Sequence, residues 1–205
     1  ITVDDVMDEV REQSERDYQL ASGLSQDVET DDNVFRQTTA RLPWLIIGML
    51  GGIGNSMILG NFDATFAAHP EMALYIPLIG GTGGNVGTQS SALIVQGLAN
   101  SSLDSKNTLK QVAKEAVVAL INATIISLLV YTYNFIRFGA MATVTYSVSI
   151  SLFAVVMFAS IFGTLVPMTL ERLKIDPAIA TGPFIAITND IIGMMLYMGI
   201  TVLLS

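Results

Sequence analysis

Five long apolar segments follow one another along most of this chain, and they constrain its fold more than any other feature. They cover residues 42–59, 73–99, 116–133, 140–170 and 178–204. A helix needs about 20 apolar residues to cross the hydrocarbon of a bilayer. Hydrophobic residues make up 51% of the 205 residues and charged residues 14%, whereas about 25% of residues are charged in soluble domains. The sequence therefore predicts an all-α membrane protein with five transmembrane helices.

Most of the negative charge lies before these segments. Residues 1–41 hold 11 acidic and 4 basic side chains, out of 18 and 10 in the whole chain. We expect a water-soluble stretch in which residues 1–3 can end a strand, Asp4 or Asp5 can cap a helix, and residues 21–33 form a loop.

The composition also excludes some functions. The chain has no stripe of basic residues that would favour nucleic-acid binding. The absence of cysteine excludes disulfides and thiol catalysis.

Basic residues predict how the segments are oriented. Cytoplasmic loops of membrane proteins carry an excess of Lys and Arg. With the N-terminus in the cytoplasm, only Arg137 would lie outside, and five crossings would put the C-terminus outside. We therefore expect a multi-pass protein of the cell (inner) membrane. The basic residues on the cytoplasmic side would be Arg11, Arg16, Arg36, Arg41, Lys106, Lys110, Lys114, Arg172 and Lys174.

The last apolar segment carries a single carboxylate, Asp190, at its middle. An acidic side chain at that depth costs about 2.5–3.5 kcal/mol on insertion scales, and such residues tend to be functional. The alternative is an Asp paired to a neighbouring helix for packing. No Lys or Arg lies in the interior of another apolar segment to serve as its partner. We therefore predict that Asp190 lines an ion path.

The surroundings of Asp190 indicate which ion it could bind. On a helix, the small residues Ala186 and Gly193 share its face, which leaves room for a hydrated ion. A symmetric dimer would bring two copies of Asp190 together. Oxygen ligands favour magnesium or calcium over softer metals, and Mg²⁺ typically binds through one or two carboxylates while it keeps its waters. The residues thus predict a divalent-cation path in which magnesium is plausible.

The second apolar segment is unusual because glycines and polar side chains fill its centre, PLIGGTGGNVGTQS. Glycine lets another helix or a ligand approach the backbone closely. Polar backbone at membrane depth survives only inside protein or beside a water-filled cavity. We therefore expect this segment to face an interior. It lacks the lysine of a phosphate-binding loop, which excludes nucleotide binding.

Three stretches together resemble the MgtE family of magnesium channels and transporters. They are ARLPWL before the first segment, PLIGGTGGNVGTQS in the second, and DPAIATGPFIAITNDIIGMMLY in the last. The likeness covers about residues 41–205. In addition, ITVDDVMDEVREQ resembles the end of the family's paired CBS magnesium-sensing domains. The resemblance implies that residues 1–38 are the end of that cytosolic sensor region with a connecting helix, that 39–205 form the transmembrane pore domain, and that the other sensor domains are missing from this chain.

The resemblance also implies a homodimer in the lipid bilayer, with one pore on its axis lined by the second and fifth helices. Mg²⁺ would be the transported ion, Mn²⁺ or Ca²⁺ could also bind in the pore, and the cytosolic sensor would close it. The chain departs from the family at Thr88 and Gly182, where Asn is frequent, so its ion preference can differ. The expected metal-site residues are Asp190, Ala186, Gly81, Gly84, Asn85 and Thr88.

The expected function is therefore a magnesium-selective channel that passes hydrated divalent cations along the electrochemical gradient, and not an enzyme. The runner-up is a proton- or sodium-coupled transporter with Asp190 as its coupling carboxylate. An intramembrane aspartyl protease would need two carboxylates that share a proton, and a membrane anchor would not explain the glycine-rich segment. Glu115 lies near the membrane edge, and we expect it to form a surface pair with Lys114.

Overall fold

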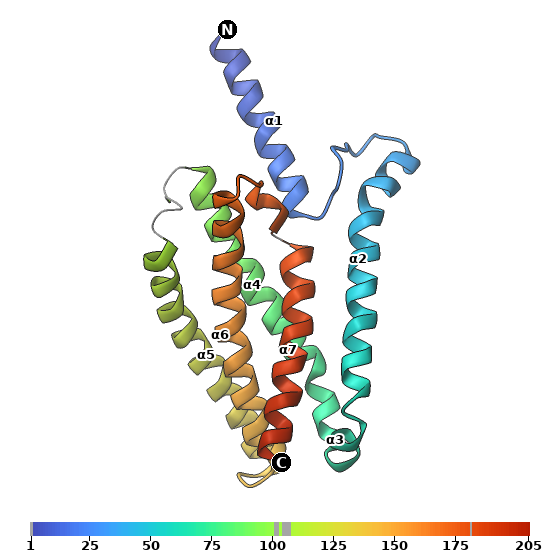
Figure 1. Ribbon diagram of the computed structural model, residues 1–205, viewed down its shortest axis with the longest axis vertical. Helices are drawn as coiled ribbons and strands as arrows, with labels where there is room; N and C mark the ends of the chain where they lie inside the picture. Colours follow the sequence, from blue (N-terminus) through green and yellow to red (C-terminus); the bar gives the residue numbers. More distant parts are fainter. Residues whose placement is uncertain (1, 101–102, 104–107, 181) are drawn as a thin grey trace.

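The computed structural model describes residues 2–100, 103, 108–180 and 182–205, and these residues form helices and no strand (Figure 1). The expected all-α fold is confirmed for this part of the chain. The α-helices are α1 (Val3–Ala21), α2 (Val34–Gly60), α3 (Asp63–Ala68), α4 (Ile76–Ala99), α5 (Thr108–Phe138), α6 (Thr143–Arg172) and α7 (Pro183–Leu204). Two 3₁₀ helices, η1 (Pro70–Tyr75) and η3 (Pro177–Ala180), precede α4 and α7.

Four of the described helices, α2, α5, α6 and α7, are long and apolar enough to cross a membrane. The second predicted segment also forms a helix, α4, of 24 residues. It is not one of the four, since its glycines and polar side chains lower its mean hydropathy. The fifth crossing therefore stays a prediction, with α4 as the helix that would make it.

The start of α1 differs from the prediction. Thr2 is the N-cap, and its hydroxyl accepts the Asp5 N–H at 3.2 Å while the Asp5 carboxylate accepts the Thr2 N–H at 2.7 Å. This capping box satisfies two backbone donors at once, so neither Asp4 nor Asp5 is the cap, and residues 2–3 do not end a strand. The Thr2 N–H also holds the pKa of Asp5 below its usual value.

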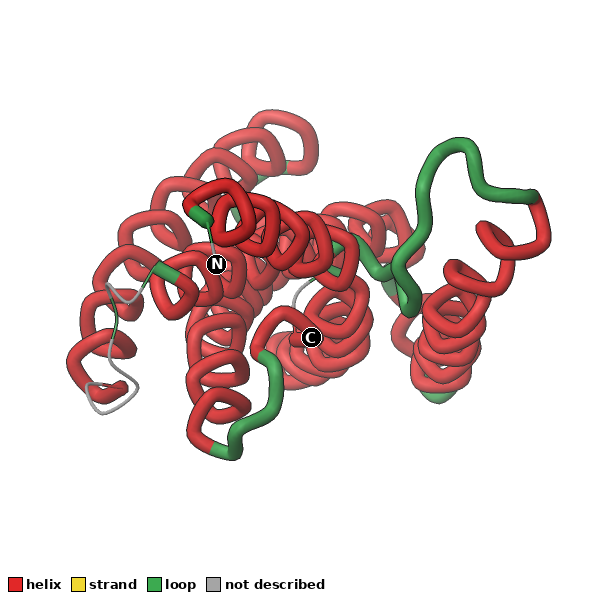
Figure 2. Tube along the Cα trace, turned by 90° about the horizontal axis from the view of Figure 1, so that it is seen from above, coloured by secondary structure: helices red, strands yellow, loops and turns green. Residues whose placement is uncertain are grey.

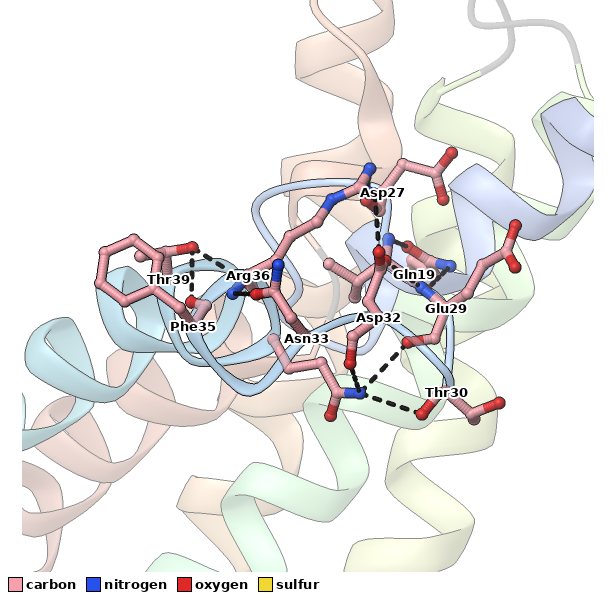
Figure 3. Close-up of polar contacts among 11 residues, drawn as sticks. Gln19, Asp27, Glu29, Thr30, Asp32, Asn33, Phe35, Arg36 and Thr39 are labelled. Carbon is pink, nitrogen blue, oxygen red and sulfur yellow. Dashed lines mark hydrogen bonds and ion pairs between the residues drawn. The ribbon is translucent and has the colours of Figure 1, made fainter.

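Side chains of α1 and α2 fix the connection between these helices, which forms the expected loop. The Gln19 Nε2 donates to the Val28 carbonyl at 3.0 Å, and the Val28 N–H donates to Gln19 Oε1 at 3.1 Å. Arg36 donates to Asp32 at 2.8 Å and to the Asp27 carbonyl at 3.0 Å (Figure 3). These bonds hold the connection against the beginning of α2.

The helix that contains the first apolar segment begins before that segment does. α2 starts at Val34, with Asn33 as N-cap accepting the Arg36 N–H at 2.8 Å, and not at residue 42. Pro43 consequently lies inside the helix. The polar residues before the apolar run can join the helix because the Asn33 side chain satisfies an exposed backbone donor.

Helix α6 lies at the centre of the bundle and packs against α5, α4 and α7, whereas α2 packs against α7. Within their apolar windows, 56% of α6 is buried but none of α2. Figure 2 shows α2 at one edge of the bundle, joined to α1 by the long connection. The core of buried side chains is made by Met72, Tyr75, Ile79, Ala123, Val144, Val148, Leu152, Val155, Val156, Met194, Tyr197 and Met198.

Glycines allow α4 to fit closely between α6 and α7. A Cβ on Gly83 would lie 2.9 Å from Cγ1 of Val155 on α6, and a Cβ on Gly163 of α6 would overlap the carbonyl oxygen of Gly87. A Cβ on Gly87 would also overlap the Asn189 side chain of α7. The glycine-rich segment thus faces protein on these sides, because only glycine permits such close backbone approach.

The last apolar segment is interrupted where a single helix was expected. The 3₁₀ helix η3 comes first, and α7 begins only at Pro183, after Gly182. Gly182 has φ 52° and ψ −121°, a conformation that glycine adopts readily and other residues do not. Pro183 then occupies a first-turn position that tolerates the missing N–H.

The break places the beginning of α7 against the end of α1. A Cβ on Gly182 would overlap the carbonyl oxygen of Ala21, and a Cβ on Gly23 would lie 2.6 Å from Cγ of Pro183. α1 therefore touches the first turn of the helix that carries Asp190.

Replacing Gly182 should loosen this contact. Gly182→Ala would add a methyl group against the Ala21 carbonyl, and we expect faster cleavage of the α1–α2 connection after Glu29 by a Glu-specific protease. Gly139→Ala is the matched control, because Gly139 also has a positive φ, of 88°, but nothing lies within 4 Å of its Cβ position. Equal cleavage rates in the two variants would show that the α1–α7 contact does not control cleavage of the α1–α2 connection.

Candidate cation site

The carboxylate of Asp190 lies against the glycine-rich face of α4. A Cβ built on Gly80 would be 3.3 Å from Asp190 Oδ1, and one built on Gly84 would be 3.6 Å from the same oxygen. Asp190 is half-buried. The two glycines are one helical turn apart and share a face of α4, so their missing side chains make the space that the carboxylate occupies.

A cavity of about 670 Å³ connects Asp190 to the junction of α1 and α2. One wall is α7, with Ala186 one turn before the acid, and the opposite wall is α2, where Gly48 faces Ile187. The cavity is large compared with the roughly 30 Å³ that a water molecule occupies in the liquid. It therefore has room for an ion with its hydration shell. Its lining residues are Ser22, Gly23, Leu24, Arg41, Trp44, Leu45, Gly48, Met49, Pro183, Ala186, Ile187 and Asp190.

One basic residue, Arg41, lines the same cavity, but it does not neutralise Asp190. Its Nη2 donates to Gln37 Oε1 at 3.4 Å, one turn back along α2. Within the described ranges, no hydrogen bond or ion pair of Asp190 is formed. The Asp190 carboxylate, which lines the cavity, is thus not neutralised by a side chain of the described residues.

The structure brings together some of the predicted metal-site residues. Gly84 and Ala186 both lie beside Asp190, since a Cβ on Gly84 would be 3.8 Å from the Ala186 Cα. Gly81 and Asn85 are exposed on the neighbouring face of α4, and nothing lies within 4 Å of the Gly81 Cβ position.

Thr88, the remaining predicted ligand, is half-buried one turn beyond Gly84. Gly81, Asn85 and Thr88 thus occupy one sector of α4, and their part in ion binding stays a prediction.

Sequence reasoning did not single out Gly80, which approaches Asp190 more closely than Gly84 does. Its spacing of four residues from Gly84 would have placed it on the same helix face. Sequence reasoning also missed Asn189, which is 1% exposed and fills the space beside Gly87. No sequence signal distinguishes Asn189 from a polar residue on an outer face, because its burial depends on how α7 is rotated.

The expectation for Glu115 was wrong. Glu115 is buried at 9% exposure, accepts a hydrogen bond from Ser90 Oγ at 2.7 Å, and accepts a second from Ser160 Oγ. Adjacent residues of a helix point in different directions, so Lys114 is exposed where Glu115 turns inward. The two residues do not form the surface pair.

Comparison with known proteins decides the family. The MgtE family, described as a divalent cation transporter, matches residues 76–200, which extend from the start of α4 into the last turns of α7. The chain belongs to the MgtE family. Together with the apolar helices, this places it in a membrane that it crosses several times.

Curated MgtE relatives match the chain over nearly its whole length. Proteins named Magnesium transporter MgtE from Bacillus subtilis and Thermus thermophilus are each 31% identical to it, over 200 and 210 residues. A third, from Enterococcus faecalis, is 28% identical over 206 residues. The alignments cover 98%, 100% and 98% of this chain but only 44%, 45% and 44% of the relatives. The chain thus spans about half the length of the curated MgtE relatives it matches.

Proposed function

We propose that this chain is the transmembrane ion path of a magnesium transporter, and that it acts as a channel for hydrated divalent cations. Asp190 from two copies of the chain forms the ion site. The observation that carries this proposal is the position of the Asp190 carboxylate, which lies over Gly80 and Gly84 and lines a cavity of about 670 Å³. The names of the curated relatives support magnesium as the ion.

A single carboxylate supplies one negative charge, whereas Mg²⁺ carries two positive charges. A two-fold dimer with its axis beside α4 and α7 brings a second Asp190 to the ion and balances the charge. The sector of α4 that carries Gly81 and Asn85 is exposed in one copy, so it is available to line the shared passage. Mg²⁺ gives up its waters reluctantly, and the carboxylates therefore hold the hydrated ion through its water shell.

The driving force is the membrane potential. An inside-negative potential contributes about 2.3 kcal/mol per elementary charge for each 100 mV. A dication is drawn inward with twice that free energy, so no coupling ion is needed. Loss of the potential would therefore slow uptake.

Residues 1–38 connect the path to the cytosolic sensor domains, and residues 39–205 form the pore domain. The contact of Ala21 and Gly23 with Gly182 and Pro183 supports a mechanical connection between the two parts. A shift of α1 would reach the first turn of α7, and through it Asp190. Binding of cytosolic Mg²⁺ to the sensor would close the pore by this connection.

The channel mechanism is tested by flux into proteoliposomes that contain the full chain and a Mg²⁺-sensitive dye. At a fixed membrane potential, collapse of the proton and sodium gradients should leave the initial rate of Mg²⁺ entry unchanged. Loss of entry after collapse of either gradient would instead support the coupled transporter, with Asp190 as its coupling carboxylate. Protein-free liposomes give the leak rate.

A further inference from the structure

The cavity between α2 and α7, which lie side by side in the bundle (Figure 1), has two chemically different ends. At one end, a Cβ on Gly48 would be 3.8 Å from Cδ1 of Ile187, which lies about one turn before Asp190. At the other end, Arg41 lines the cavity seven residues earlier on α2. Seven helical residues span about 10 Å. The positive charge of Arg41 therefore lies at the end away from Asp190.

The wall that α2 contributes beyond Arg41 is apolar and open to the outside. Arg41, Trp44, Leu45 and Gly48 follow one another at helical spacing, so they share one face of α2. Leu45 and Met49 line the cavity and are nevertheless 64% and 57% exposed. The cavity is thus a groove that opens along the side of a helix that can cross the membrane.

Close packing ends the groove at its deeper end. A Cβ on Gly51 would overlap the side chain of Ile187, so α2 and α7 touch there. Toward Arg41 no comparable glycine contact joins the two helices among the described residues, and the groove widens. The groove therefore begins at a basic residue and narrows along an apolar wall.

Arg41 has no acidic partner in this groove. Its Nη2 donates to the neutral Gln37 side chain at 3.4 Å, and none of the ion pairs among the described residues includes Arg41. A guanidinium group binds phosphate oxygens through parallel N–H bonds, which makes arginine a preferred phosphate ligand. A cation, in contrast, is repelled at this position. The Arg41 end of the groove therefore suits an anion.

The setting of the groove favours a lipid over a free anion. Arg41 comes directly before the apolar run 42–59, and none of the apolar window of α2 is buried by the rest of the chain. Trp44 is the residue type that gathers at the interface between lipid and water. A free phosphate would contact Arg41 but would leave the apolar wall at Leu45 and Met49 uncovered. A phospholipid covers both, because its phosphate and acyl chain follow one another in the same order.

We propose that the groove between α2 and α7 binds an anionic phospholipid of the bilayer. Its phosphate lies on Arg41, and an acyl chain follows Leu45 and Met49, which leaves the α4 side of Asp190 to the ion. The bound phosphate neutralises Arg41, so a cation that approaches Asp190 meets less repulsion. That effect on transport rests on the proposed function, whereas lipid binding does not.

Trp44 reports directly on the occupant, because it is the one tryptophan of the chain and lines the groove. Bromine atoms on an acyl chain quench tryptophan fluorescence on contact. The full chain is placed in bilayers of unlabelled phosphatidylcholine that contain a small fraction of brominated phosphatidylglycerol or, in parallel, of brominated phosphatidylcholine. Chance contact with the surrounding bilayer is the same for both. We expect the anionic lipid to associate about fivefold more strongly, the effect of one basic residue near an anionic membrane surface.

Removing the charge tests the phosphate contact. Arg41→Gln should abolish the preference for the anionic lipid, because the remaining side chain is neutral. Arg16→Gln is the matched control, since Arg16 is exposed on α1 and does not line the groove. It should keep the preference. Asp190→Asn should also keep it, which separates lipid binding from the proposed ion path.

Filling the groove tests the acyl-chain contact with Arg41 in place. Gly48→Met adds a flexible apolar side chain at a position where a Cβ makes ordinary contact, and it should also abolish the preference. Gly52→Met is its control, because Gly52 does not line the groove and nothing lies within 4 Å of its Cβ position. Circular dichroism confirms the helix content of each variant.

Four results would overturn the proposal. Equal quenching by the two brominated lipids would mean that the headgroup charge is not recognised. A preference that survives both Arg41→Gln and Gly48→Met would place the anionic lipid elsewhere. Loss of the preference on addition of inorganic phosphate would assign Arg41 to a free anion. Fluorescence of Trp44 that neither lipid quenches would mean that a second copy of the chain covers the groove.

Discussion

Asp190→Asn is expected to reduce Mg²⁺ transport by roughly 10- to 100-fold, because a charged ligand contributes on the order of 1.5–3 kcal/mol. The Asn side chain has nearly the same shape and fits the space over Gly80 and Gly84. It also removes a charge from an apolar helix, so folding should not suffer. The measurement is the initial rate of Mg²⁺ entry into proteoliposomes, together with size-exclusion chromatography in detergent.

Asp63→Asn is the matched control, since Asp63 is exposed at the first residue of α3 and lies outside the cavity. It should transport like the unmodified chain. Unchanged transport by a well-folded Asp190→Asn variant would mean that the ion crosses elsewhere. Transport lost equally in both variants would indicate a general electrostatic effect of negative charge and not an ion ligand.

Gly163→Ala should strongly destabilise the helix bundle. The new Cβ would overlap the carbonyl oxygen of Gly87, and backbone cannot rotate away as a side chain can. Overpacking of this kind costs about 1–3 kcal/mol and sometimes more, and we expect the upper end of that range. Thermal unfolding in detergent, followed by circular dichroism, should give a clearly lower Tm.

Gly54→Ala provides the comparison, because nothing lies within 4 Å of its Cβ position. Ala is favoured over Gly inside a helix by about 1 kcal/mol, so this variant should be as stable as the unmodified chain or slightly more stable. If Gly163→Ala unfolds at the same temperature as Gly54→Ala, α4 and α6 do not cross as closely as the structure has them.

The local sequence was informative about which segments form helices. Runs of apolar residues gave the helical segments, because hydrophobicity and length are properties of a contiguous stretch. The ends of these helices were predicted less well. α2 begins at Val34 and α7 begins after Gly182, since a capping side chain and a glycine conformation set those boundaries.

The candidate site was predictable only in part. Asp190 was identifiable because a lone acid in a long apolar helix has a cost that needs a reason. Gly84 and Ala186 were found with it, but the closer contact at Gly80 was not. Glu115 was misassigned because its partners, Ser90 and Ser160, lie 25 and 45 residues away along the chain. Sequence spacing carries no information about such contacts.

The sequence by itself determined the helical membrane character of this chain, the glycine-rich segment and the single acid within its last helix. These follow from the free energy of placing each residue in hydrocarbon or water, which depends on composition and local spacing. Only the tertiary structure decided that Gly80 and Gly84 face Asp190, that Gly182 lies against Ala21 at the end of α1, and that Glu115 turns inward. Those features depend on the rotation and crossing of whole helices, which are set by close packing among many side chains at once.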